Sequence, residues 1–252
     1  MAVAIFAGIT SCVQDATVDE GGFLPKETIT ISVAESRTHL GEKDGDSYPV
    51  YWSTGDQVSI NGISSDPLGE TAEGSVKGLF NFTGLLEPTY KASYPATAEA
   101  GKVYFAPEQT YVAGTFSEGA AVLYGESETL VIQMQHASGV LKFPIKIAES
   151  EEVSLKRVVI ENVNGKLAGE YSAELVDGEV VVTPSESATS KIVYDCGNVA
   201  LSTEPTNLFI AVPAGEYAEL KVSLISTDNR IMNFKVTAAG EKVIKAGIVR
   251  EF

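Results

Sequence analysis

Apolar and polar residues alternate along almost every segment of this chain. The alternation is clear in ETITISVAESR (residues 27–37), YKASYPA (residues 90–96) and VLKFPIKIA (residues 140–148). A period of two places successive side chains on opposite faces of a β-strand, and no stretch longer than about two turns keeps the period of a helix. Most runs are short and end at Gly, Pro, Asn or Asp. We therefore predict an all-β fold built from antiparallel β-sandwiches.

Three dipeptides between these runs are typical of tight turns, namely Asn61-Gly62, Asn164-Gly165 and Asp177-Gly178. Asn-Gly and Asp-Gly suit two-residue β-turns, because both central residues of such turns need a positive φ. We expect a turn at each dipeptide, with Asn164-Gly165 closing a hairpin. Pro144 cannot donate to a strand ladder, so we expect its strand to lie at a sheet edge or to be bulged there.

A change in strand character divides the chain. The 252 residues suit one large all-β domain or two domains of ordinary size. Strand candidates are short and separated by long loops up to residue 135, and longer and more regular from residue 137 onward. We predict an N-terminal β-sandwich over residues 27–136 and a C-terminal one over residues 137–252.

The N-terminal residues resemble an export signal followed by a lipid-anchoring cysteine. The apolar run Ala2–Ile9 is far shorter than the ~20 residues that span a bilayer, and no positively charged residue precedes it. Ile9-Thr10-Ser11-Cys12 resembles a bacterial lipobox. We therefore predict a lipoprotein signal over residues 1–12 that ends at a lipidated Cys12, and a tether over residues 13–26. The alternative is a chance cysteine after a hydrophobic leader.

Charge and cysteine content exclude several classes of function. The net charge of −16 and the pI of about 4.5 disfavour binding to nucleic acid, whose phosphates would be repelled. If Cys12 carries lipid, Cys196 is the only other cysteine, which excludes a disulfide framework and a cysteine zinc site. Cys196 ends the apolar run KIVYDC, so we expect it to be a small buried hydrophobe.

No motif for catalysis or cofactor binding is present. His39 and His136 are isolated in the sequence, which makes a poor metal site. There is no G-x-S-x-G elbow, P-loop or dinucleotide fingerprint. Glycoside hydrolysis needs two carboxylates that converge in space. The chain has 34 acidic residues, so the sequence does not indicate whether any two of them form such a pair. We expect no cofactor, no metal and no enzymatic activity, and keep a secreted hydrolase with converging carboxylates as a minor alternative.

The order of several short motifs resembles the fimbrillin-like lipoproteins of anaerobic gut and oral bacteria, which include the subunits of surface fimbriae. No single motif is specific, but their order and spacing together cover essentially the whole chain. Besides Cys12, the matching segments are SRTHLG (36–41), YWSTGDQVSING (51–62), YKASYPA (90–96), P-x-Q-x-Y (107–111), HASGVLKFPI (136–145), KLAGEY (166–171), LFIAVPAGEYAELKV (208–222) and KVIKAGIVREF (242–252).

The resemblance implies two tandem transthyretin-like β-sandwich domains and export to the outer membrane. It also implies that a protease specific for arginine or lysine removes the first strand, after which a strand from another fimbrial subunit fills the groove by β-strand addition. Mapped onto this sequence, the detachable strand is Glu27–Val33, with Ile29, Ile31 and Val33 as the residues that plug the groove. The cleavage would follow Arg37, in a polar loop.

Two principal hypotheses follow, with fimbrial subunits or a surface ligand as the expected partners. The first is a structural or adhesive component of a fimbria. Family shaft subunits carry a C-terminal donor extension, whereas this sequence stops at Phe252, so we expect an anchor, tip or accessory subunit. The alternative is a non-polymerising surface lipoprotein that binds a glycan or a host protein through exposed aromatic residues, with Trp52, Tyr90 and Tyr94 as candidates.

Overall fold

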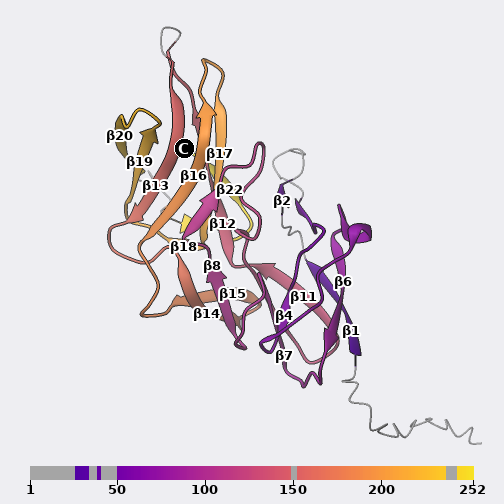
Figure 1. Cartoon of the computed structure of the whole chain (residues 1–252). Coiled ribbons are helices and arrows are strands. Elements are labelled where there is room, and N and C mark those ends of the chain that lie inside the picture. The colour runs from indigo at the N-terminus through magenta and orange to yellow at the C-terminus, as the bar shows by residue number, and fades with distance from the viewer. Residues whose placement is uncertain (1–25, 34–38, 41–49, 149–151, 237–242) are drawn as a thin grey trace, which may run out of the picture.

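The protein is almost entirely β-sheet in its computed structural model, which describes residues 26–33, 39–40, 50–148, 152–236 and 243–252. The only helix within these ranges is one 3-10 turn, η1 (Glu70–Ala72). The prediction of an all-β fold is therefore confirmed. Figure 1 shows two large sheets at opposite ends of the molecule, one around β1 and β6 and the other around β13 and β19.

The first large sheet has seven strands and is built mainly from the N-terminal half of the chain. Its core contains Trp52, Phe80 and Phe82, which are all buried. All neighbouring strands run antiparallel except β1 and β11, which run parallel. In spatial order the strands are β5 (Ile63–Ser64), β4 (Ser59–Ile60), β7 (Tyr90–Tyr94), β10 (Leu123–Ser127), β11 (Val131–His136), β1 (Lys26–Val33) and β6 (Lys77–Thr83).

A five-stranded and a three-stranded sheet share a second core in the C-terminal half. Leu141 and Phe143 from the smaller sheet belong to the same buried cluster as Val158, Tyr194 and Val222 from the larger one. The larger sheet has the order β20 (Ile231–Val236), β19 (Leu220–Ser226), β13 (Ser154–Asn162), β16 (Lys191–Ala200) and β9 (Glu108–Thr110). The smaller has the order β17 (Thr206–Pro213), β12 (Ser138–Ile145) and β22 (Val249–Glu251).

Three smaller sheets complete the described structure. The three-stranded one covers a further core of buried residues that includes Val103, Phe105 and Tyr171. It has the order β15 (Glu179–Pro184), β14 (Gly169–Val176) and β8 (Lys102–Phe105). The two-stranded pairs are β18 (Gly215–Glu216) with β21 (Val243–Ile244), and β2 (His39–Leu40) with β3 (Val50–Tyr51).

The segment that holds β8 and β9 joins strands from the later part of the chain before the chain returns to the seven-stranded sheet. β8 pairs with β14, and β9 pairs in parallel with β16. Gln109 on β9 fixes this crossover, because its buried amide donates to the Ala211 carbonyl at 2.7 Å and accepts from the Ala211 N–H at 3.0 Å. The division into domains at residues 136 and 137 stays a prediction.

Two of the three expected turns close hairpins. Asn61 and Gly62 both have a positive φ between β4 and β5, as do Asp177 and Gly178 between β14 and β15. The expected hairpin at Asn164-Gly165 is wrong. The strand before it, β13, pairs with β16 and β19, whereas the strand after it, β14, joins the small sheet. Both edges of β13 are thus occupied, so β14 has no edge on which to fold back.

Pro144 lies where one side of β12 loses its partner. β17 pairs with all of β12, from Ser138 to Ile145, without a bulge. β22 pairs with the other side only from Val140 to Lys142. At Pro144 the strand is therefore locally an edge within the described residues, which is where a residue without an N–H is tolerated.

Candidate functional site

The first described strand, β1, lies inside the seven-stranded sheet instead of at its edge. It pairs antiparallel with β6 from Lys26 to Ser32 and parallel with β11 from Thr30 to Val33. Both long sides of the strand therefore contribute to a main-chain ladder. Figure 1 shows β1 at the end of the molecule away from β19 and β20. The sheet order places β1 between β11 and β6. Without β1, each of these neighbours would face an open edge across a groove one strand wide.

Two side chains of β1 fill this groove. Ile29 and Ile31 are both 0% exposed and belong to the core of the sheet. The Cα partner of Ile29 is Phe80 on β6, and that of Ile31 is Ile132 on β11. Complete burial of one isoleucine side chain contributes about 1.5–3 kcal/mol. Both residues are therefore buried between β6 and β11, and their role as plugs of a detachable strand stays a prediction.

Polar contacts on the outer side of β1 add little to its attachment. Thr28 Oγ1 donates to Asn81 Oδ1 at 2.7 Å, and Lys26 Nζ lies 2.9 Å from Asp66 Oδ2. About half of each Lys26 and Asp66 side chain is exposed, and such surface pairs contribute roughly 0–1 kcal/mol. The strand is therefore held mainly by its backbone ladder and its two buried isoleucines.

The remaining predicted residues of this region are only partly described. The backbone of Val33 is paired with Met134 on β11, but the Val33 side chain lies outside the described part. Cys12 and Arg37 also lie outside the described residues. Lipidation, cleavage and the role of Val33 as a plug therefore stay predictions.

The three aromatic residues proposed for sugar stacking are buried in the same core as β1. Trp52 is 2% exposed, and Tyr90 and Tyr94 are buried as well. The Trp52 ring meets the Tyr94 ring edge to face, with centroids 5.5 Å apart. Tyr94 donates its hydroxyl to Asp56 Oδ1 at 2.7 Å, and burial together with this carboxylate raises the Tyr94 pKa. These side chains stabilise the fold and are not available to a ligand.

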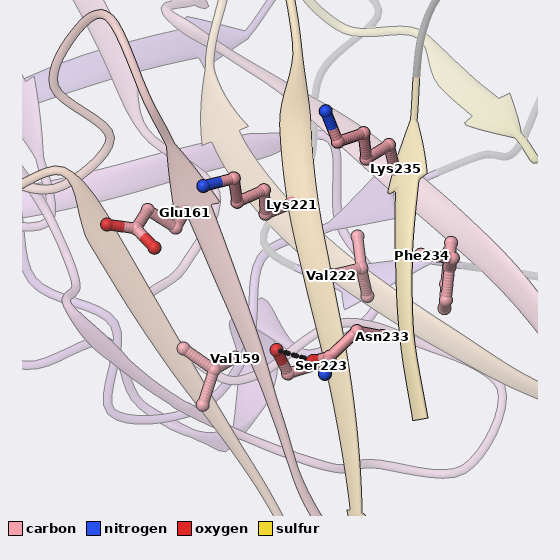
Figure 2. Close-up of a pocket in the computed structure, with 8 residues that line it drawn as sticks. All are labelled: Val159, Glu161, Lys221, Val222, Ser223, Asn233, Phe234 and Lys235. Carbon is pink, nitrogen blue, oxygen red and sulfur yellow. Dashed lines mark hydrogen bonds between the residues drawn. The ribbon is translucent and has the colours of Figure 1, made fainter. Parts of the chain in front are cut away.

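A hollow of about 290 Å³ lies on the sheet formed by β13, β19 and β20, as Figure 2 shows. Several of its polar groups already have partners, either within the hollow or just outside it. Ser223 Oγ donates to Asn233 Oδ1 at 2.6 Å, and Lys235 Nζ lies 2.9 Å from Glu219 Oε2. The one aromatic ring that lines it, Phe234, packs against the C-terminal core. We therefore assign no ligand to this hollow.

A second hollow, of about 270 Å³, lies where the loop after β7 meets β8. Tyr104 on β8 lines it and is 46% exposed, which makes it the one exposed aromatic residue in the described part of the chain. Sequence reasoning missed Tyr104, although its neighbours give a signal. Val103 and Phe105 are buried, so alternation places Tyr104 on the opposite face of β8.

The structure describes the surroundings of Cys196 and permits a search for metal-binding clusters. Cys196 is buried, as expected, and burial followed by the nearby Asp195 carboxylate raises the pKa of its thiol to about 12. Within the described ranges, no three His, Cys, Asp or Glu side chains gather into a metal-binding cluster. In those same ranges, no helix has the length and apolar character needed to cross a membrane.

Comparison with known proteins gives likenesses in structure but not in sequence. No protein-family model matches the sequence, and no curated protein matches it. A candidate cell adhesion protein from Bacteroides fragilis is 11% identical, with a TM-score of 0.48 and 88% of this chain and 91% of that chain covered. A candidate cell adhesion protein from Bacteroides ovatus is 10% identical, with a TM-score of 0.47 and coverage of 87% and 89%.

A fimbrial protein is among the similar structures. The tip fimbrial protein Mfa3 from Porphyromonas gingivalis, with a C-terminal truncation, is 9% identical, with a TM-score of 0.31 and coverage of 86% of this chain and 83% of that chain. The similar solved structures thus include cell adhesion and fimbrial proteins.

Proposed function

We propose that this protein is a structural and adhesive subunit of bacterial surface fimbriae, and that it assembles by β-strand addition after β1 has been removed. One observation carries the proposal. β1 is the first described strand, yet it sits between β6 and β11 and supplies two fully buried plugs, Ile29 and Ile31. A terminal strand inserted into the middle of a sheet can be replaced by a strand of another chain without changing the rest of the fold.

The physics of exchange follows from the two kinds of contact that β1 makes. The ladders to β6 and β11 use main-chain groups that any extended segment supplies, and they provide affinity. The positions of Ile29 and Ile31 accept large apolar side chains two residues apart, and they provide specificity. The donor from another subunit should therefore carry an apolar-x-apolar pattern. Until cleavage, β1 covers edges that would otherwise aggregate.

The proposal includes export as a lipoprotein anchored at Cys12 and cleavage after Arg37. It requires no catalytic residue in this chain, and its partners are other fimbrial subunits and the outer membrane. The first measurement is the intact mass and N-terminal sequence of the protein from its native cell surface. A chain that begins at Thr38 supports removal of the lipid and β1. A chain that begins at a diacylated Cys12 contradicts the cleavage step and favours an anchor subunit or the non-polymerising alternative.

Strand exchange itself is tested with the full chain carrying Cys12→Ser. After digestion with an arginine-specific protease, the protein is mixed with a synthetic peptide of residues 26–33, and binding is followed by fluorescence polarisation. We expect the peptide to bind, and a peptide with Asp at positions 29 and 31 to fail. The matched control is the Arg37→Ala protein, which should keep β1 and take up no peptide. Equal uptake of both peptides would contradict the proposal.

The alternative function, a surface protein that binds a glycan or a host protein, no longer has Trp52, Tyr90 or Tyr94 to support it. One observation still favours a ligand, which is the exposed Tyr104 in its hollow.

A further inference from the structure

We propose that the hollow at Tyr104 is a binding site for a neutral sugar ring, formed by β8, by Glu170 on β14 and by the loop that follows β7. The site does not depend on strand exchange and is compatible with a polymerising or a monomeric protein. Its lining includes Thr97, Ala98 and Glu99 from the loop, Lys102 and Tyr104 from β8, and Glu170 from β14.

The Tyr104 ring supplies an apolar platform. Its side chain is 46% exposed, while the residues on either side of it are buried. No hydrogen bond of the Tyr104 hydroxyl is found among the described residues. A tyrosine that combines an apolar ring with a polar tip suits a ligand that is apolar on one face and polar at its rim. A pyranose ring has this character, because its axial C–H groups form an apolar face and its hydroxyls lie around the edge.

Two charged side chains stand beside the ring and provide directional hydrogen bonds. Glu170 on β14 is the Cα partner of Tyr104, so the two side chains are cross-strand neighbours. Lys102 Nζ lies 3.0 Å from Glu170 Oε1, which holds both groups in place at the hollow. This pair uses one carboxylate oxygen and one ammonium proton, which leaves Oε2 as an acceptor and further N–H groups as donors. Hydrogen bonds from sugar hydroxyls to charged groups are the stronger kind.

The loop that lines the hollow is held in place through Thr97. Thr97 N–H donates to Ser59 Oγ at 2.9 Å, and Thr97 Oγ1 lies 2.9 Å from Ser93 Oγ. The same hydroxyl lies 3.2 Å from the carbonyl oxygens of Glu99 and Lys102, either of which can accept its proton. Thr97 therefore fastens the loop to β4 and β7. A loop held in this way loses little conformational freedom on binding, which favours affinity for a small ligand.

The volume of the hollow suits a small ligand. Several of the residues that line it from the loop are small. Its volume of about 270 Å³ is near the lower end of the ~300–1,000 Å³ that is typical of ligand pockets, so one sugar ring is the expected occupant. Ala96 and Ala98 line the hollow with side chains of a single methyl group. A Cβ at Gly62 would lie 2.5 Å from the Ala98 carbonyl oxygen, so the β4–β5 turn packs closely against the loop.

Charge selects a neutral sugar over an acidic one. The hollow carries Glu99 and Glu170 against the single cation Lys102, in a chain whose net charge is −16. A sialic or uronic acid would bring a further negative charge to this site and would be repelled. Neutral hexoses and N-acetylhexosamines remain as the ligand class.

The test uses the full chain with Cys12→Ser and saturation-transfer NMR with the methyl glycosides of galactose, mannose, fucose and N-acetylglucosamine. Each sugar is present at up to about 20 mM, so that a site with a dissociation constant of about 1 mM would be nearly saturated. N-acetylneuraminic acid serves as the acidic comparison. We expect at least one neutral glycoside to bind, with saturation strongest at its ring C–H protons, and the acidic sugar to bind more weakly.

Variants of Tyr104 then distinguish a loss of sugar binding from a loss of folding. Tyr104→Ala should raise the dissociation constant of the glycoside by about tenfold or more. Tyr104→Phe keeps the ring, and its dissociation constant should stay within about threefold of the parent value. Leu79→Ala is the matched control, because Leu79 is an exposed residue on β6 in a different sheet, and it should bind like the parent. Thermal melting shows whether each variant remains folded.

Two results would overturn the proposal. One is that no neutral glycoside binds at the highest concentration. The other is that a folded Tyr104→Ala protein binds as tightly as the parent, which would place the sugar elsewhere. Neither result bears on strand exchange, which is measured by peptide uptake, so the two proposals fail or succeed separately.

Discussion

Truncation of Ile31 tests whether β1 is seated in its groove in solution. Ile31 is 0% exposed and lies between Gly78 on β6 and Ile132 on β11. Its neighbour Gly78 has no side chain, and a Cβ there would lie 2.3 Å from the Phe80 ring. That ring already occupies the space beside Ile31. The surroundings are therefore unlike a loose site that could collapse around a smaller side chain.

The magnitude follows from the atoms removed. Ile31→Ala deletes three buried carbons, and the lost transfer free energy at ~0.8 kcal/mol each is about 2.4 kcal/mol. A cavity term adds to this, because close-packed cores relax only partly, so we expect a total loss of about 3–4 kcal/mol in the free energy of unfolding. For a chain of this length, 1 kcal/mol shifts the melting temperature by roughly 2–4 °C, which predicts a fall of about 10 °C.

The assay is urea unfolding followed by circular dichroism, with the melting temperature as a second readout. The matched control is Val131→Ala on the adjacent strand β11, because Val131 is 62% exposed. This control should stay within about 0.5 kcal/mol of the parent. If Ile31→Ala also changes the free energy of unfolding by less than about 1 kcal/mol, β1 is not docked in solution, and the argument for a strand that guards a groove is refuted.

Two further predictions concern residues of the five-stranded sheet. Gln109→Leu should cost about 2–5 kcal/mol in urea unfolding, because it leaves the buried N–H and C=O of Ala211 without partners, whereas Gln135→Leu, which loses one exposed hydrogen bond, should cost less than about 0.5 kcal/mol. The Cys196 thiol has a pKa raised from 9.0 to about 12 by burial. The stability that the neutral thiol contributes is therefore complete below pH 9 and is lost as the pH rises toward 12. Urea midpoints of a Cys196→Ala variant should accordingly fall less than those of the parent between pH 9 and 11, and equal falls would contradict this reasoning.

Local sequence patterns predicted the kind of structure well, because β alternation and turn chemistry act over a few residues. The Asn61-Gly62 and Asp177-Gly178 turns formed as expected, since both dipeptides tolerate a positive φ. The failure at Asn164-Gly165 shows the limit of this reasoning. Pairing of a strand depends on which edges are free in the assembled sheet, and no local pattern contains that information.

The same limit explains why the aromatic residues predicted to bind a ligand are buried instead. Trp52, Tyr90 and Tyr94 were proposed because aromatic rings often stack on sugars, yet all three fill the N-terminal core. Alternation tells which residues share a face of one strand but not which face is covered by another sheet. The exposure of Tyr104 follows from the burial of its neighbours Val103 and Phe105. That burial depends on residues much later in the chain, such as Tyr171 on β14.

The sequence by itself determined that this chain is all-β, where two of its tight turns lie, and that Ile29 and Ile31 share one face of the first strand. These properties depend on the period of side chains along a strand and on the φ angles that each residue tolerates. Only the tertiary structure decided that β1 lies between β6 and β11, that β8 and β9 join strands of the later chain, and that Tyr104 is left exposed beside Glu170. Strand order and burial arise from contacts between residues far apart in the chain, and these contacts are fixed only when the sheets close over their cores.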